Sequence, residues 1–166
     1  SKNKLISNKA AFAALKNDGS VVTWGDQGAG GGGSAGWKKH NDYNNQDLIN
    51  NLKSGVVEIF SNDTAFAALK NDGSVITWGG NYEPDGSYQR SFNGGGDSSS
   101  VKDKLTSGVK TIFSTGAAFA ALKNDGSVIT WGEGAAGGGG STGYKKYNDY
   151  NNQDLINNLK SGVVEI

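Results

Sequence analysis

The sequence predicts an all-β protein built from three consecutive repeats of about 53 residues. The decapeptide AFAALKNDGS occurs at residues 11–20, 65–74 and 118–127, so successive copies start 54 and then 53 residues apart. Each copy continues into a valine-containing segment that ends in Thr-Trp-Gly. The chain has 27 glycines and one proline, which indicates glycine turns between short strands. A period of this length is typical of small sheets that need their neighbours to be stable.

Every repeat contains a strong hairpin signal. In the first repeat, Asn-Asp-Gly at residues 17–19 separates the segments AFAALK and SVVTWG. Glycine adopts the positive φ that such a turn requires, so we expect two antiparallel strands here. The alanine-rich segment favours a helix by propensity alone, but the turn and the β-branched partner favour a strand.

A further strand is predicted before each hairpin. In SGVVEIFSND, at residues 54–63, alternation places Val57 and Ile59 on one face and Val56 and Phe60 on the other. A strand of this kind is covered on both faces. Each repeat is therefore expected to contain three or four antiparallel strands.

One or two turns of helix are predicted between consecutive repeats. In residues 44–55, Asn45 is a candidate cap, Leu48 and Leu52 are four residues apart, and Gly55 ends the helical pattern. The corresponding residues of the middle repeat are Val101, Leu105 and Gly108.

The period divides the chain into repeat 1 at residues 1–58, repeat 2 at 59–111 and repeat 3 at 112–166, which together form one repeat domain. Repeat 2 carries its own insert at residues 81–92, and residues 161–166 match the first strand of a further unit. Because the chain starts within a repeat and without methionine, we expect it to be part of a longer repeat protein.

Composition argues against several classes of function. The chain has 16 basic and 16 acidic residues, so it lacks the net positive charge with which proteins bind nucleic acid or an anionic membrane. No apolar run approaches the roughly 18 residues of a spanning helix, so membrane insertion is not expected. The absence of cysteine excludes disulfides, thiolate metal sites and cysteine nucleophiles.

No catalytic or cofactor motif is complete. The single histidine, His40, is replaced by Tyr147 at the matching position of the third repeat, which argues against catalysis or metal binding. The glycine run at residues 28–34 lacks the lysine of a phosphate-binding loop. Residues 41–47 lack the glycine and glutamate of a calcium loop. We therefore expect no enzyme activity, cofactor or metal.

The repeat resembles that of the regulator of chromosome condensation family. The resemblance is carried by GVVEIFSND at residues 55–63, AFAALKNDGSVITWG at residues 65–79 and the glycine-rich connections, and it covers all three units. It implies a β-propeller-like arrangement, with the sheets as blades and the alanines and tryptophans between them. Family members usually close a ring of seven blades. With three units, we expect an open arc or a propeller completed by oligomerisation, because open blade faces expose apolar surface.

Two sets of residues, aromatic except for one arginine, stand out. Those that recur at the same place in every repeat are predicted to be packing anchors between sheets. They are Phe12, Trp24, Phe66, Trp78, Phe119 and Trp131. Residues in the connections and the insert are candidate partner contacts. They are Trp37, Tyr43, Tyr82, Tyr88, Arg90, Tyr144 and Tyr150.

These observations favour a non-enzymatic structural or adhesive repeat module of a larger bacterial surface or secreted protein, acting by self-assembly or scaffolding. An extracellular or cell-surface location is expected, although a cytoplasmic one is equally compatible with the lack of cysteine. The alternative is a β-propeller binding module that recognises a protein, peptide or glycan through its loops. Fold resemblance alone does not decide between them.

Overall fold

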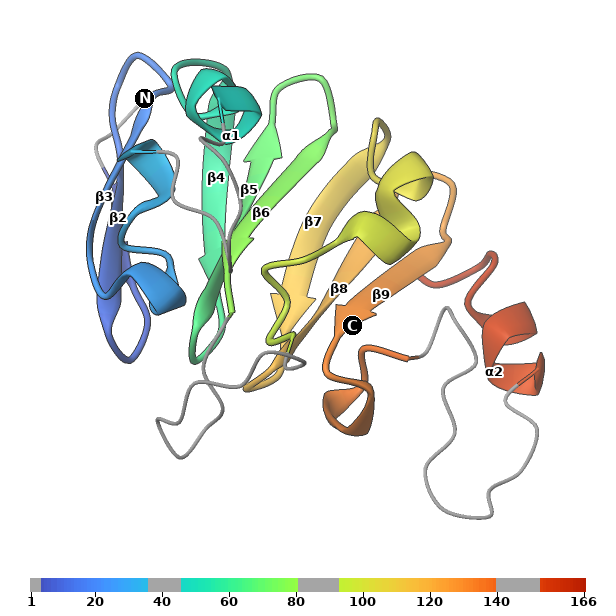
Figure 1. Ribbon diagram of the computed structural model, residues 1–166. Helices are drawn as coiled ribbons and strands as arrows, with labels where there is room; N and C mark the ends of the chain where they lie inside the picture. The colour runs from blue at the N-terminus through green and yellow to red at the C-terminus, as the bar shows by residue number, and fades with distance from the viewer. Residues whose placement is uncertain (1–3, 36–45, 81–92, 140–152) are drawn as a thin grey trace.

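The computed structural model describes residues 4–35, 46–80, 93–139 and 153–166, and within them the chain forms three separate three-stranded sheets. The sheets follow one another in chain order and lie side by side like blades, without closing into a ring (Figure 1). Each is an antiparallel meander in which the middle strand pairs with both neighbours. The predicted all-β arrangement of three blade-like units is confirmed. The strands are β1 (Lys4–Ser7), β2 (Ala11–Leu15), β3 (Val21–Gly25), β4 (Val56–Ser61), β5 (Ala65–Lys70), β6 (Val75–Gly79), β7 (Val109–Ser114), β8 (Ala118–Lys123) and β9 (Val128–Gly132).

The predicted hairpins form as expected. Gly19 closes the β2–β3 turn with a φ of 81°, and its N–H donates to the Lys16 carbonyl oxygen at 3.0 Å. The Asp18 carboxylate accepts from the Ser20 backbone N–H at 2.9 Å, which ties the turn to the next strand. The same bonds recur in the β5–β6 and β8–β9 turns. The turn is therefore specified locally by four residues.

The alternation predicted for residues 54–63 is wrong at the start of β4. Val56 pairs with Lys70, but the next pair is Glu58 with Leu69, so Val57 forms a bulge. The bulge reverses the faces, and Val56 and Ile59 are both buried whereas Val57 is 53% exposed. The same irregularity occurs in β7 between Val109 and Thr111.

Short helices follow the last strand of each sheet. The helical turn predicted before the second unit is confirmed as α1, in which Leu48 is buried, and Leu52 is buried just after it. Its counterpart in the middle unit is a 3-10 helix, η3, followed by the buried Leu105. The helices are η1 (Gln27–Ala29), η2 (Gly33–Ala35), α1 (Gln46–Asn51), η3 (Ser99–Lys104), η4 (Gly134–Ala136) and α2 (Gln153–Asn158).

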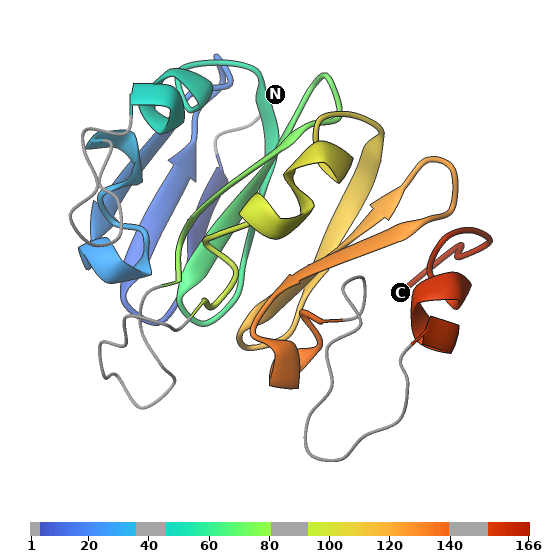
Figure 2. The same cartoon turned by 45° about the vertical axis from the view of Figure 1, so that its right-hand side comes forward.

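The apolar core lies between the sheets. One cluster joins the first sheet to the second and contains Ala11, Ala13 and Leu15 on one side and Phe66 and Trp78 on the other. A second cluster joins the second sheet to the third in the same way. The small alanine side chains of the middle strands let the large aromatic side chains of the next sheet approach the backbone. The two junctions therefore contain equivalent residues of successive units. Figure 2 shows the three sheets following one another from a second side.

Equivalent backbone hydrogen bonds also join each unit to the next. The Val56 N–H donates to the Gly19 carbonyl oxygen, and the Val109 N–H donates to that of Gly73, both at 3.0 Å. Residues 161–166 form no strand, yet the Val163 N–H donates to the Gly126 carbonyl oxygen at 3.0 Å. This segment therefore follows the path by which β4 and β7 enter their own sheets.

Candidate interaction surfaces

The partner-contact candidates of the sequence all lie outside the described residues. Trp37 and Tyr43 fall in residues 36–45, Tyr82, Tyr88 and Arg90 in residues 81–92, and Tyr144 and Tyr150 in residues 140–152. The described part of the chain instead presents surfaces made by the sheets, their turns and the glycine loops.

An aromatic pair lies on the same face of every sheet. Phe12 pairs across the strands with Trp24, Phe66 with Trp78, and Phe119 with Trp131. The ring centroids within each pair are 5.3, 5.4 and 5.5 Å apart, respectively. Such distances are favourable for aromatic contact, so each pair forms a single apolar block.

The three pairs differ in their exposure. In the second sheet, Phe66 is 0% exposed and Trp78 3%, and the pair of the third sheet is equally buried. In the first sheet, Phe12 is 41% exposed and Trp24 45%. The reason is that the unit before a sheet covers this face, and none of the described residues covers it on the first sheet.

A glycine loop of the preceding unit covers each buried pair. The Trp78 indole N–H donates to the Gly30 carbonyl oxygen at 3.1 Å. A Cβ atom added at Gly30 would lie 2.6 Å from Phe66 Cδ2, so the ring rests directly on the loop backbone. The next junction repeats this arrangement, because the Trp131 indole N–H donates to Gly95 at 3.0 Å. Glycine is required at these positions both by the close approach and by its positive φ.

We did not predict this role for the glycine-rich connections, which the sequence presented as turns between sheets. The recurrence of a glycine run and a tryptophan in each unit was the available signal. It could not be used alone, because Gly30 and Trp78 are 48 residues apart.

The exposed aromatic pair belongs to a larger apolar surface, here called the first-sheet face, which consists of Leu5, Phe12, Val22 and Trp24. Their exposed fractions are 59%, 41%, 44% and 45%. In the second sheet the corresponding residues, Ile59, Phe66, Ile76 and Trp78, belong to or pack against the first apolar cluster. The first-sheet face therefore has the residues that form one side of a junction in the second sheet, but none of the described residues packs against it.

The third unit presents the opposite half. Here η4 ends at Gly137, whose φ of 104° matches the 99° of Gly30 at the end of η1. An added Cβ atom at Gly137 would meet nothing within 4 Å. The loop borders a pocket of about 170 Å³, here called the third-unit socket, which is lined among others by Phe113, Ala118, Ala120, Ala136 and Gly137.

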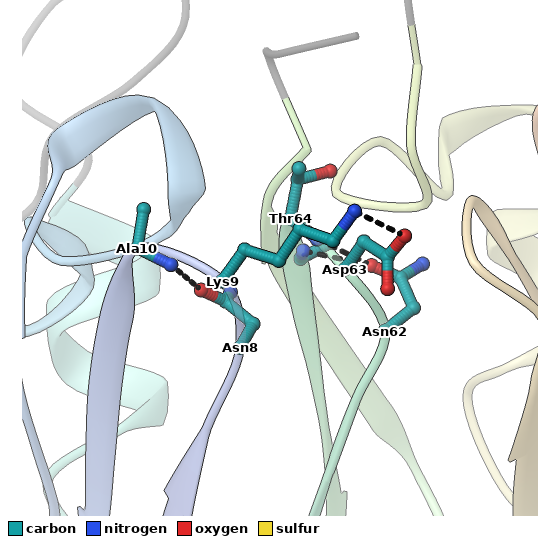
Figure 3. Close-up of polar contacts among 7 residues, drawn as sticks. Asn8, Lys9, Ala10, Asn62, Asp63 and Thr64 are labelled. Atoms are coloured by element: carbon teal, nitrogen blue, oxygen red, sulfur yellow. Dashed lines mark hydrogen bonds and ion pairs between the residues drawn. The ribbon is translucent and has the colours of Figure 1, made fainter. Parts of the chain in front are cut away.

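Polar turns join the units at one edge of the sheets (Figure 3). Lys9, in the β1–β2 turn, forms an ion pair with Asp63 of the β4–β5 turn at 3.2 Å. The Lys9 backbone N–H also donates to the Asp63 carbonyl oxygen at 3.0 Å, and the Asp63 N–H donates to Gly116 at 3.1 Å. The edge thus forms an open polar trough whose groups already bond to one another.

Asparagine side chains hold the first two of these turns. Asn8 Oδ1 accepts from the Ala10 and Ala11 N–H groups at 3.0 and 2.9 Å. Asn62 Oδ1 accepts from the Thr64 and Ala65 N–H groups at 3.1 and 2.8 Å. Figure 3 labels Asn62 and Thr64. These bonds explain the asparagines structurally, without a ligand.

Among the described side chains, one buried polar atom has no hydrogen-bond partner, the Thr64 hydroxyl. Thr64 is 6% exposed, and the corresponding positions of the other units are Ala10 and Ala117. The hydroxyl therefore has no counterpart elsewhere in the repeat.

The carboxyl groups of the three hairpin aspartates have a lowered pKa. The hydroxyl of Ser20, and then its backbone N–H, stabilise the Asp18 carboxylate and lower its pKa from the ordinary value of 3.8. Ser74 and Ser127 lower the pKa of Asp72 and Asp125 in the same way. All three carboxylates are surface groups that close turns, and they are not positioned for acid–base chemistry.

Within residues 4–35, 46–80, 93–139 and 153–166, no group of three or more His, Asp or Glu side chains is placed to hold a metal ion. In the same ranges, no helix has the length and apolar character needed to cross a membrane. Three candidate interaction surfaces in the described part of the chain are the apolar first-sheet face, the third-unit socket and the polar trough.

The sheets and the junctions between them define the class of protein: an open array of three propeller-blade-like units. No protein-family model and no curated protein sequence matches the chain. Solved structures with a similar arrangement include β-propeller proteins of the RCC1 family, whose repeat the sequence resembles.

Three such structures illustrate the likeness. Prp20p from Saccharomyces cerevisiae, described with its binding to Gsp1p and histones, is 20% identical with a TM-score of 0.45, and the match covers 80% of this chain and 31% of that one. The structure of Kap60 bound to yeast RCC1 (Prp20) matches at 20% identity and a TM-score of 0.46, over 80% and 30% of the two chains. Human WBSCR16 matches at 18% identity and 0.43, over 80% and 34%. The chain thus spans about a third of the length of these proteins.

Proposed function

We propose that the chain is a non-enzymatic protein-binding repeat module that acts as a scaffold, and that the first-sheet face is its binding surface. The observation that carries this proposal is a contrast in exposure between equivalent residues. Phe12 and Trp24 are 41% and 45% exposed, whereas the preceding unit covers their counterparts Phe66 and Trp78, which are 0% and 3% exposed. A contiguous exposed apolar patch of this kind marks an interaction site.

The chemistry of the face supports a polypeptide as its ligand. In both internal junctions the same aromatic block contacts glycine backbone, and its indole N–H donates to a main-chain carbonyl oxygen. A binding surface with one apolar block and one directional donor is typical of protein interfaces, in which tryptophan and other aromatics act as anchors. The first-sheet face offers both groups in the same geometry.

A scaffold role in a larger surface or secreted repeat protein is the biological setting that we propose for this module. The repetition of the units and the balanced charge support it. Fractionation of cells that make the protein tests the location, because recovery in the cytoplasmic fraction alone contradicts a surface or secreted role.

Photo-crosslinking in the same cells tests the binding surface. A photoreactive phenylalanine analogue at Phe12 should give protein adducts, whereas the same analogue at the similarly exposed Val57 should not. Adducts from a probe at Tyr88 in the insert, with none from Phe12, would instead support binding through the loops. The absence of adducts from Phe12 contradicts the proposal.

A further inference from the structure

The two ends of the sheet array carry the two complementary halves of one junction. The first-sheet face has the aromatic pair without a glycine loop against it. The third unit has a glycine loop, at Ala136 and Gly137, without an aromatic pair against it. Between the first and second units, the same two halves are joined by Gly30, Phe66 and Trp78.

The half offered by the third unit is already formed. In the first unit, the Asn8 side-chain N–H donates to the Ala29 carbonyl oxygen at 2.8 Å, which holds the loop before Gly30. In the third unit, the Thr115 hydroxyl donates to the Ala136 carbonyl oxygen at the same distance. The loop therefore needs no rearrangement to receive a ring, and such preorganisation lowers the cost of binding.

Burial shows that the socket is open. Ala29 and Gly30 are buried beneath the aromatic pair of the second unit. Their counterparts Ala136 and Gly137 are half-buried and exposed, respectively. The pocket of about 170 Å³ lies at the place where Phe66 lies in the first junction.

We propose that the chain associates head to tail with a second copy of itself, the first-sheet face of one copy occupying the third-unit socket of the other. This proposal rests on the proposed function and names the partner of its binding surface. In the contact, Phe12 lies against Gly137, and the Trp24 indole N–H donates to the Gly137 carbonyl oxygen. These contacts repeat those of Phe66 and Trp78 with Gly30.

A second copy is the favoured occupant because one chain carries both halves, and the match extends an interface that already occurs twice within it. The balanced net charge adds no long-range repulsion between copies. Since the two surfaces differ, the contact is heterologous: it closes a ring or continues into longer assemblies.

The last residues of the chain lie at the margin of the socket. Ile166 lines the pocket and corresponds in sequence to Ile59, the first-strand residue paired with Ala68. In the incoming copy, Leu5 has this place, since it pairs with Ala14. Ile166 is 51% exposed and must give way when Leu5 enters. Removal of Glu165 and Ile166 should therefore strengthen the association.

Sedimentation equilibrium of singly blocked variants tests the proposal. Phe12→Asp places a charge on the aromatic half, and Gly137→Ala adds a methyl group where the incoming ring should lie. Each variant alone should be monomeric in a concentration range in which the wild-type chain self-associates, with affinity reduced at least about 30-fold. An equimolar mixture should form a one-to-one dimer and nothing larger, because one intact half remains on each variant.

Two controls keep this test specific. Val57→Asp introduces the same charge at an exposed valine outside both halves, and Gly108→Ala introduces a side chain at another positive-φ glycine outside both halves, where an added Cβ atom would meet only Lys123 Cε, at 3.5 Å. Both should associate like the wild type. A wild-type chain that stays monomeric over the whole range overturns the proposal, as does a mixture of blocked variants that fails to dimerise. If the Phe12 photo-adduct in cells is a different protein and the purified chain is monomeric, the binding module stands and the second copy is wrong.

Discussion

The indole N–H of Trp78 donates to the carbonyl oxygen of Gly30, a residue 48 positions earlier in the chain, at 3.1 Å. The bond recurs between Trp131 and Gly95 at 3.0 Å. Both junctions between sheets therefore use the same directional contact, next to a phenylalanine whose ring lies against the tryptophan ring. The repeated residues of the second and third units thus have equivalent places in the two junctions.

Replacement of the two equivalent phenylalanines should have very different effects. Phe66→Ala should reduce the free energy of unfolding by about 3–5 kcal/mol, because the ring is fully buried between two sheets. Phe12→Ala should reduce it by less than about 1 kcal/mol in dilute solution, because that ring is 41% exposed. Urea unfolding measures both changes. Equal losses would show that the first-sheet face is covered in solution.

Thr64→Ala should stabilise the protein. The Thr64 hydroxyl is buried without a partner, and alanine is the residue that the other two units have at this place. Removal of an unsatisfied buried hydroxyl is expected to raise the free energy of unfolding by about 1 kcal/mol. Thermal unfolding provides the measurement. A lower melting temperature for the variant would mean that the hydroxyl has a partner in solution.

The hairpin aspartates should make stability depend on pH in the acid range. The pKa values of Asp18, Asp72 and Asp125 are lowered in the folded chain, so their ionised forms stabilise the fold above the ordinary value of 3.8, and this contribution is lost as the pH falls through the lower folded values. The effect should be small, since solvent screens these exposed groups.

A variant with Asn at all three aspartate positions isolates this contribution. Its urea midpoint should fall less than that of the wild type as the pH is lowered below about 4. The urea midpoints of the two proteins should change in the same way with pH between pH 5 and pH 7, where all three carboxylates stay ionised. If the urea midpoints of the two proteins also fell equally below pH 4, the ionised aspartates would not contribute to the stability of the fold.

The sequence predicted what is local. The hairpins follow from Asn-Asp-Gly between apolar segments, and α1 from the spacing of Leu48 and Leu52. The bulge at Val57 was missed, because alternation of apolar residues looks the same with or without one extra residue in the strand.

Features that depend on contacts between different units could not be predicted from the sequence. Phe12 and Phe66 stand in identical decapeptides, yet one is exposed and the other buried, because their surroundings come from other units. The socket at Gly137 was likewise hidden, since its shape depends on η4, β7 and β8 together. The contact candidates in the connections and the insert lie outside the described residues and stay predictions.

The most direct test of the account compares Gly30→Ala with Gly137→Ala in dilute solution. The two glycines have nearly the same φ, 99° and 104°, so an alanine costs about 1–2 kcal/mol of backbone strain at either place. At Gly30 the new Cβ atom also meets the Phe66 ring at 2.6 Å, whereas at Gly137 it meets nothing within 4 Å. We predict that Gly30→Ala lowers the free energy of unfolding by about 1–3 kcal/mol more than Gly137→Ala. Equal losses would contradict the claim that aromatic rings packed on glycine loops join the units.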